Sequence, residues 1–263
     1  MPKYLSYTQV DTLLRCGRVY EFRYVLGIKT PANGNLLRGD AYHKAIAAAY
    51  SHVVIYREMP KIEQVEQVYI DTWNKRLSDK LIIDDGSEIS VPMIDFGGKD
   101  PDKMKDDGIV LLRKYCAEIL PKIIPFEVEV KKTFEYNGIP LLSYIDLISW
   151  DNIVYDHKLG SRSFSSDEIN KNMQSTFYGL VLGYGNNNRK FEFHLHQALS
   201  TKEPKINDIT IIRTVDDFDW FGELIVRVWK QIQMGIFAPN PTGWGCSSDY
   251  CSYWSNCRVP KSF

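Results

Sequence analysis

The apolar positions in the first 122 residues recur with a helical period. Ser6 and Gln9 have the spacing of a capping box, so we expect a first helix to begin there and to contain Cys16. Further along, an alanine-rich stretch passes through His43, and two other stretches repeat apolar residues every three or four positions. The pattern therefore predicts helices over 37–58, 61–79 and 109–122, with a polar loop over 84–107.

From residue 126 onward the period changes to two. Phe126 to Val130 alternates as a half-buried strand does, and Asn137-Gly138 is a strong signal for a hairpin turn. The pattern predicts strands over 126–130, 141–150, 153–158, 191–197 and 208–214, and helices over 165–183 and 217–235. Strands flanked by helices indicate an α/β fold with a central mixed sheet, a helical N-terminal part and an irregular, cysteine-rich C-terminal tail.

The composition limits the number of domains, the cellular location and the surface charge that we expect. The 263 residues are 44% hydrophobic and 25% charged, which is enough to build a sizeable core. Without an internal repeat or a flexible linker, we expect one domain over 1–263: a helical part (1–122), the sheet core (123–215), and a helix with the tail (216–263). The sequence has neither a long apolar run nor a signal peptide, so we expect a cytoplasmic protein with no membrane partner. A net charge of -1 excludes a broadly basic surface.

Acidic and basic side chains gather on two predicted strands. Asp156 and Lys158 share one face of their strand, while His157 points to the other. The turn at Asn152 brings Asp146 onto the neighbouring strand, so that two carboxylates and an ammonium converge. Carboxylates can hold Mg²⁺ or Mn²⁺, and the lysine can orient a water or stabilise a charged transition state. Since Asp156 follows the apolar run 153–155, we expect it to be buried.

The C-terminal tail carries Cys246, Cys251 and Cys257 within twelve residues. Three cysteines so close together suggest a site that needs a fourth ligand, and a four-thiolate site suits either Zn²⁺ or an iron–sulfur cluster. The spacing does not separate the two. Cys116 lies among apolar neighbours of a predicted helix, so we expect it to behave as a small buried hydrophobe.

The order of these residues along the chain resembles a known family. Leu5-Ser6-Tyr7 with Cys16, the stretch from Arg38-Gly39 to His43, and the later Asp-x-Lys are similar to the RecB-like branch of the PD-(D/E)XK nucleases. This branch includes AddB nuclease domains and CRISPR-associated exonucleases. The resemblance extends from Ser6 to Cys257 and includes, in order, Glu129, Asp146, Asp156 with Lys158, and Gln174 with Tyr178.

The resemblance implies specific roles. His43, Asp146, Asp156 and the backbone carbonyl of His157 would ligate the catalytic Mg²⁺ or Mn²⁺, and Lys158 would be the catalytic lysine. Gln174 and Tyr178 would hold that lysine or the DNA, and Glu129 would be a further catalytic carboxylate. It also implies that Cys16 is the fourth ligand of the site formed by the tail cysteines, and that this site holds a [4Fe–4S] cluster. Taken singly, His43 is also compatible with a core histidine, Gln174 and Tyr178 with ordinary packing, and Glu129 with an exposed strand residue.

The function that this implies is an exonuclease acting on DNA ends, single-stranded or frayed, in recombination and repair, phage replication or CRISPR spacer acquisition. The sequence has no Gly-x-x-x-x-Gly-Lys-Ser/Thr motif, so unwinding would require a helicase or another recombination or CRISPR adaptation partner. The alternative is a non-catalytic nucleic-acid-binding module with a zinc-stabilised tail. The convergent charges argue against this alternative, since a protein that only binds nucleic acid has no need to bury them.

Overall fold

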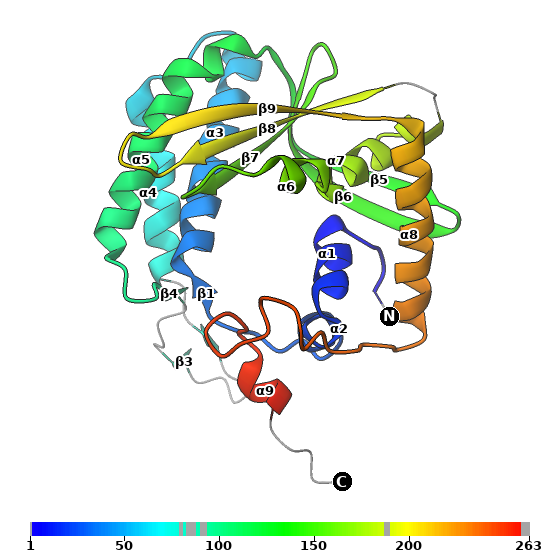
Figure 1. The fold of residues 1–263 in the computed structure, drawn as a ribbon. Helices are drawn as coiled ribbons and strands as arrows, with labels where there is room; N and C mark the ends of the chain where they lie inside the picture. The colour runs from blue at the N-terminus through cyan, green and yellow to red at the C-terminus, as the bar shows by residue number, and fades with distance from the viewer. Residues whose placement is uncertain (1, 79–80, 83–87, 90–93, 187–189, 259–263) are drawn as a thin grey trace.

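Five strands form one mixed sheet at the centre of the molecule (Figure 1). The computed structural model describes residues 2–78, 81–82, 88–89, 94–186 and 190–258. The sheet has the order β5-β6-β7-β8-β9, and only the pair β7–β8 is parallel. Its strands are β5 (Pro125–Tyr136), β6 (Ile139–Ser149), β7 (Val154–Gly160), β8 (Phe191–Leu199) and β9 (Lys205–Arg213). The predicted α/β fold with a mixed central sheet is confirmed.

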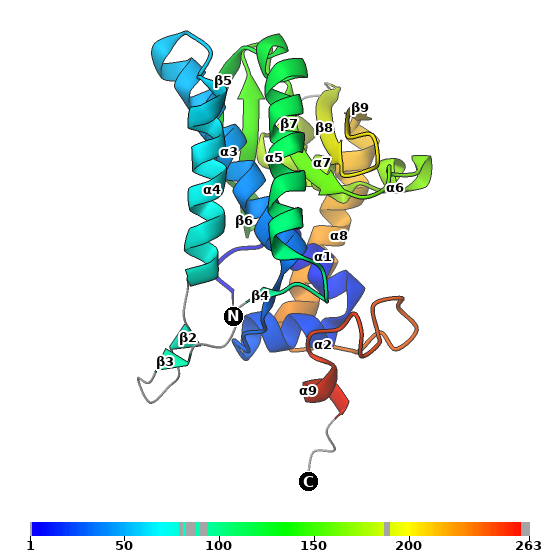
Figure 2. The same ribbon diagram turned by 90° about the vertical axis from the view of Figure 1, so that its left-hand side faces the viewer.

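Helices cover both faces of this sheet (Figures 1 and 2). The α-helices are α1 (Tyr7–Arg15), α2 (Gly17–Tyr20), α3 (Gly34–Tyr56), α4 (Ile62–Ser78), α5 (Pro101–Glu118), α6 (Ser166–Asn170), α7 (Met173–Val181), α8 (Val215–Gln233) and α9 (Trp254–Arg258). The shorter elements are η1 (Glu21–Val25), η2 (Leu120–Lys122), η3 (Tyr184–Asn186), β1 (Ala32–Asn33), β2 (Leu81–Ile82), β3 (Glu88–Ile89) and β4 (Ile94–Asp95). No helix in the described part of the chain is long and apolar enough to cross a membrane.

The core consists of two layers, one on each face of the sheet. Ile145 and Leu195 belong to the layer that packs against α1, α7 and α8. Leu147 and Tyr155 belong to the layer that packs against α3, α4 and α5. Burying each such aliphatic side chain stabilises the fold by roughly 1.5–3 kcal/mol. Successive residues of β7 alternate between the layers, so Asp156 and Lys158 face α7 while His157 faces α3 and α5.

The predicted hairpin turn between β5 and β6 is present. Asn137 and Gly138 both have left-handed backbones, with φ of 50° and 75°. A type I′ turn requires this conformation at both central residues, and Asn-Gly is the dipeptide that favours it. The turn fixes the antiparallel register of β5 and β6, in which Val130 pairs with Ile145.

One helix boundary near the N-terminus differs from the prediction. Ser6 caps α1 as expected, since its side chain accepts a hydrogen bond from the Gln9 amide. The helix ends at Arg15, however, and Cys16 follows it in an extended conformation with φ of -166°. Cys16 therefore lies in the break between α1 and α2, and it is not inside a helix.

Two other predicted boundaries are also wrong. Helix α5 begins within the predicted loop, because the Asp100 side chain caps it and Pro101 occupies its first position. Residues 83–87 and 90–93 of that loop lie outside the described residues. The single helix predicted over 165–183 is two helices, since Asn172 has a non-helical backbone and caps α7 by accepting from the Ser175 amide at 2.9 Å.

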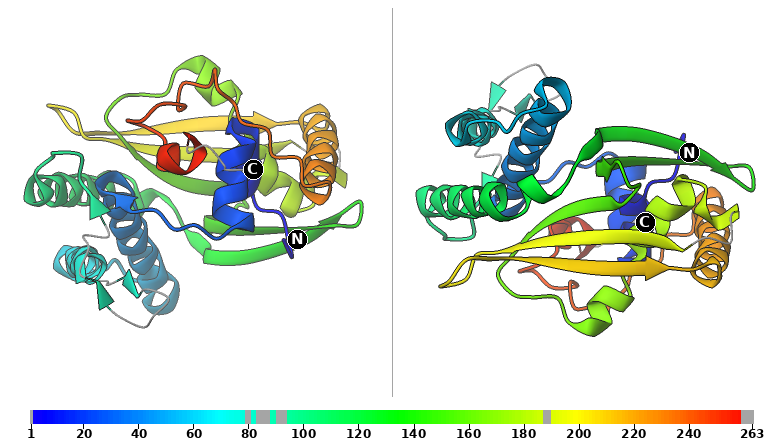
Figure 3. Two further views of the ribbon diagram at one scale, coloured as in Figure 1. Left: turned by 90° about the horizontal axis from the view of Figure 1, so that it is seen from below. Right: turned by 90° about the horizontal axis from the view of Figure 1, so that it is seen from above.

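The C-terminal tail lies against the N-terminal helices, at one end of the molecule (Figure 3). The Gly17 amide donates to the Ala238 carbonyl at 2.9 Å, and the Asn240 side chain donates to the Arg15 carbonyl at 3.1 Å. Tyr253, which is buried, donates to the Ile28 carbonyl at 3.0 Å. These hydrogen bonds hold two segments more than 200 residues apart in the sequence side by side.

Candidate active site

The central sheet opens between β6 and β7. The two strands pair only at Leu147↔Tyr155 and Ile148↔Val154. Further along β6, its edge is instead bordered by Leu5, which exchanges backbone hydrogen bonds with Pro140 and Leu142. The stretch of β6 between these two pairings has no strand partner on that side. Asp146 lies in this opening, next to the diverging end of β7.

One half of the site is built around Asp156, which is only 1% exposed. Its Oδ2 lies 2.7 Å from Lys158 Nζ, and its Oδ1 accepts a hydrogen bond of 2.8 Å from Gln174 Nε2. The amide of Gln174 also donates to the hydroxyl of Tyr178 at 2.7 Å, and that hydroxyl donates to the Tyr144 carbonyl. Helix α7 therefore orients the Asp156 carboxylate and anchors itself to the open stretch of β6.

The other half is built around Asp146. Its Oδ2 lies 3.1 Å from His43 Nδ1 and accepts a hydrogen bond of 3.1 Å from the backbone amide of His157. In an extended strand the amide and carbonyl of one residue point to the same edge, so the His157 carbonyl also faces this side. Glu129 offers a third group, since one ligand atom each from His43, Glu129 and Asp146 lie within 4.8 Å of one another.

The backbone of Glu129 is unusual. Its φ of 49° is in the left-handed region, which glutamate rarely adopts, and it lies opposite Asp146 in a register where the residues on either side pair normally. The side chain is exposed. The local irregularity of β5 thus occurs at the residue that meets His43 and Asp146, which argues against an ordinary surface position.

The two carboxylates differ in their proton affinity. Burial disfavours the charge of Asp146, but His43 and Lys158 outweigh this effect and hold the pKa of Asp146 well below its usual value. Burial raises the pKa of Asp156, and the Lys158 ammonium opposes this shift only partly because Asp146 adds to it. Opposed pKa shifts in adjacent acids are typical of active sites.

The cations of the site are held in their charged forms. Burial would lower the pKa of Lys158, but Asp156 and Asp146 outweigh it and raise that pKa. Asp146 raises the pKa of His43 in the same way, against the effect of burial. Without a metal, these two cations balance the carboxylates. A metal ion bound here would replace the proton on His43, because a ligating imidazole must be neutral.

The donor set fits a hard divalent cation. Two or three carboxylates and one backbone carbonyl are the oxygen ligands that Mg²⁺ and Mn²⁺ prefer, and the imidazole of His43 suits Mn²⁺ better than Mg²⁺. The Oδ2 atom of the buried Asp156 has the Lys158 ammonium as its partner at 2.7 Å, so a bound cation would share this oxygen with the lysine.

Behind the site lies an aromatic network that the sequence did not reveal. The side chain of His157 is buried on the α3/α5 face, with its ring 5.2 Å from the Tyr115 ring and 6.4 Å from the Tyr50 ring. The Tyr115 hydroxyl lies 3.1 Å from that of Tyr50, 3.4 Å from His157 Nδ1 and 3.0 Å from His196 Nδ1. Burial lowers the pKa of His157 well below its usual value, so this ring is neutral.

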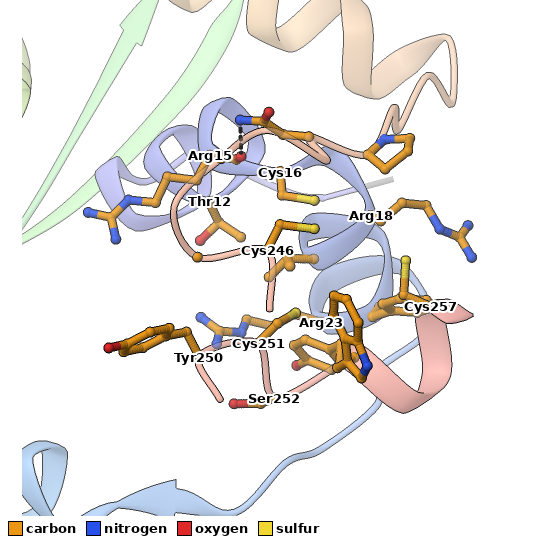
Figure 4. A pocket seen from close by; sticks show the side chains of 18 of the residues that line it. Thr12, Arg15, Cys16, Arg18, Arg23, Cys246, Tyr250, Cys251, Ser252 and Cys257 are labelled. Carbon is orange, nitrogen blue, oxygen red and sulfur yellow. Dashed lines mark hydrogen bonds between the residues drawn. The ribbon is translucent and has the colours of Figure 1, made fainter. Parts of the chain in front are cut away.

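The four cysteines of the expected cluster site line a single cavity of about 390 Å³ (Figure 4). Cys16 comes from the break after α1, Cys257 from α9, and Cys246 and Cys251 from the loop before α9. All are free thiols. Among the described residues, no three of these sulfurs lie within 4.8 Å of one another. Cys116 is far along the chain in α5 and packs against the α3/α5 layer.

Residues 4–258 match the family model of the PD-(D/E)XK nuclease superfamily. A solved structure of a predicted exonuclease from Eubacterium rectale superposes with a TM-score of 0.56 at 15% identity, covering 98% of this chain and 90% of that one. At this identity the likeness concerns the fold alone. The structure of SSO0001 aligns with a TM-score of 0.39 at 16% identity over 96% of this chain and 94% of that one, too weakly to support an argument. No curated protein matches the sequence.

Proposed function

The chain belongs to the PD-(D/E)XK nuclease superfamily, and on this premise we propose that it is a deoxyribonuclease that requires Mn²⁺ or Mg²⁺ and cleaves DNA from its ends. The observation that carries the proposal is the convergence of opposite charges in the opening of the sheet. His43 lies 3.1 Å from Asp146, and Lys158 lies 2.7 Å from a carboxylate that is 1% exposed. Even paired charges are costly to bury, so their convergence in one opening of the sheet is typical of an active site.

In this proposal Asp146, Asp156, His43 and the His157 carbonyl hold the metal ion, with Glu129 as a further candidate. When bound, the ion would polarise the scissile phosphate and lower the pKa of a water molecule. Lys158 orients that water and stabilises the charge that develops on the phosphate oxygens. Its Nζ is suited to both tasks, since the side chain is 36% exposed and the neighbouring carboxylates keep it protonated.

Gln174 and Tyr178 act as positioning residues. The sequence resemblance implied that they hold the lysine or the DNA, but their hydrogen bonds here reach Asp156 Oδ1 and the Tyr144 carbonyl. A metal-ligating carboxylate held in one rotamer by a second hydrogen bond needs less reorganisation when the ion binds. We therefore assign them to the orientation of Asp156.

Action from DNA ends follows from the charge balance. With a net charge of -1, the protein lacks the broad basic surface that gives sequence-independent binding inside a duplex. Trp244 and Tyr250 are 78% and 71% exposed with ring centroids 5.8 Å apart, and such rings can stack on unpaired bases. Unpaired or frayed ends are therefore the expected substrate. Unwinding an intact duplex would require a separate helicase, recombination or CRISPR adaptation partner.

The test compares a linear single strand, a linear duplex and a relaxed closed circle of the same sequence, each with Mn²⁺ and with EDTA. We expect Mn²⁺-dependent release of nucleotides from the linear forms, while the closed circle persists. Equal cleavage rates on the closed circle and the linear duplex would show that the enzyme cleaves internally, and would contradict cleavage from the ends. Absence of any cleavage with Mn²⁺ or Mg²⁺ would overturn the nuclease proposal and favour a module that only binds nucleic acid.

We further propose that Cys16, Cys246, Cys251 and Cys257 hold a [4Fe–4S] cluster rather than zinc. Sulfurs that share one tetrahedral zinc ion at about 2.3 Å lie about 3.8 Å apart. In every set of three of these sulfurs at least one pair is more than 4.8 Å apart, and the ligands of a larger group lie further apart than those of one zinc ion. Such a group would staple the tail to the N-terminal helices. Anaerobically purified protein should contain iron, which Cys251→Ala loses and Cys116→Ala keeps; stoichiometric zinc without iron would favour the zinc site.

A further inference from the structure

A second cluster of metal-binding side chains lies on the opposite face of the sheet from Asp156. It consists of His194 and His196 on β8 and Asp208 on β9. The antiparallel register pairs His196 directly with Asp208, and His194 is two residues away on the same face. One ligand atom from each of the three lies within 4.8 Å of the others.

Both histidines have one ring nitrogen occupied and the other directed at the carboxylate. His194 Nε2 lies 3.0 Å from Glu192 Oε1, while its Nδ1 lies 2.7 Å from Asp208 Oδ1. His196 Nδ1 lies 3.0 Å from the Tyr115 hydroxyl, while its Nε2 lies 3.6 Å from Asp208 Oδ1, beyond a hydrogen bond. A metal-ligating histidine almost always donates its other N–H to an oxygen partner in this way.

The distances are close to those of a zinc site. Imidazole nitrogens and a carboxylate oxygen at about 2.1 Å from one tetrahedral ion lie about 3.4 Å apart. The two observed separations, 2.7 and 3.6 Å, bracket this value and would be matched by a small rotation of the Asp208 carboxylate. Two imidazoles and one carboxylate are ligands typical of Zn²⁺, whereas Mg²⁺ prefers oxygen alone.

An ordinary ion cluster is the competing explanation. His194 lies between two carboxylates, so a protonated imidazole would satisfy both Asp208 and Glu192. This explanation does not account for His196, whose Nε2 is also directed at Asp208. That ring is 2% exposed, its Nδ1 lies 3.0 Å from the Tyr115 hydroxyl, and its Nε2 stays 3.6 Å from Asp208 Oδ1, where a simple ion pair would close to hydrogen-bond distance. An imidazole and a carboxylate held at this separation have the spacing of two ligands that share one zinc ion.

We propose that His194 Nδ1, His196 Nε2 and a carboxylate oxygen of Asp208 bind Zn²⁺, with water completing the coordination. The ion would clip β8 to β9 beside the C-terminal end of α5. It would also fix the His196 tautomer that donates from Nδ1 to Tyr115, the residue that contacts His157 behind the active site. The site is distinct from the proposed catalytic metal ligands and from the four cysteines.

The first test measures bound zinc by equilibrium dialysis at a fixed low concentration of free Zn²⁺. Wild type is compared with His194→Gln, Asp208→Asn and, as a matched control, His52→Gln. His52 also faces a carboxylate, at 3.7 Å from Glu58, but is in no metal-compatible group of the described residues. Comparing variants cancels zinc bound at other sites. We expect one zinc per chain to be lost in the first two variants and none in His52→Gln.

The second measurement uses wild-type protein, so its result does not depend on whether a variant folds. The ring-nitrogen signals of the histidines are followed by ¹⁵N NMR as Zn²⁺ is added. The proposal predicts shifts of one nitrogen in each of His194 and His196, with Nδ1 ligating in the first and Nε2 in the second. Unchanged zinc content in both His194→Gln and Asp208→Asn, or zinc that shifts the signals of His43 but neither of these rings, would overturn it. Nuclease activity enters neither test.

Discussion

Replacing Lys158 by methionine should remove nuclease activity and also destabilise the metal-free fold. Asp156 is 1% exposed, and among the described residues Lys158 provides its only ion pair. Methionine keeps much of the volume of the lysine stem but leaves the carboxylate without its counter-charge. The hydrogen bond from Gln174 remains, so the carboxylate keeps one of its two partners.

The size of the effect follows from the burial of the two partners. Removing one member of a buried ion pair typically costs about 3–5 kcal/mol, because the remaining charge is desolvated and unpaired. Lys158 is 36% exposed, so water can partly replace its ammonium, and we expect the lower end, about 3 kcal/mol. Adding Asp156→Asn removes the unpaired charge and should restore at least about 2 kcal/mol of this loss.

The assay is urea denaturation followed by circular dichroism in EDTA, over a double-mutant cycle of Asp156→Asn and Lys158→Met. Lys171→Met serves as the control, since its ion pair with Asp167 is largely exposed and should contribute less than about 1 kcal/mol. A loss below about 1 kcal/mol in Lys158→Met, or no recovery in the double variant, would show that Asp156 is not a buried charge that depends on Lys158.

Two further predictions concern groups outside that pair. Burial raises the pKa of the Cys116 thiol from 9.0 to about 12, so at pH 8 its thiolate is about a thousand times scarcer than in the unfolded chain. The greater nucleophilicity of a more basic thiolate offsets part of this, and we expect native Cys116 to react with a disulfide reagent roughly 30 to 60 times more slowly than in urea; equal rates would contradict its burial. Gln174→Leu should lower kcat by about 10- to 100-fold, and the free energy of unfolding by roughly 1.5–3 kcal/mol, through loss of the hydrogen bond to the buried Asp156 Oδ1. Undiminished turnover would remove Gln174 from the site.

Features governed by local periodicity could be predicted from the sequence. Alternation located all five strands of the central sheet, and Asn137-Gly138 located the hairpin turn. The same period placed Asp156 and Lys158 together and His157 on the other face, which the structure bears out. Burial of Asp156 followed from the apolar run before it. Each of these depends on residues close in sequence.

Features that depend on distant contacts could not be predicted. The strand β6 diverges early from β7, which opens the site, and beyond the divergence β6 is bordered by Leu5, which is distant in the sequence. The break at Asn172 is a competition between a helical backbone and a side-chain cap, which apolar periodicity does not detect. The cluster of His194, His196 and Asp208 arises only from the register of β8 and β9. The alternating pattern of the two strands fixes no such register by itself.

The most direct test of the account is the initial rate of nucleotide release from a linear single strand in Mn²⁺ by Asp146→Asn. This change removes one charge from the group formed with His43 and Glu129 and keeps the side-chain shape. Asp71→Asn on the exposed side of α4 is the matched control for the same chemical change. We predict a loss of at least about a hundredfold in Asp146→Asn at an unchanged fold, and a wild-type rate in Asp71→Asn. Wild-type turnover by Asp146→Asn in Mn²⁺ would contradict a metal-centred active site in the opening between β6 and β7.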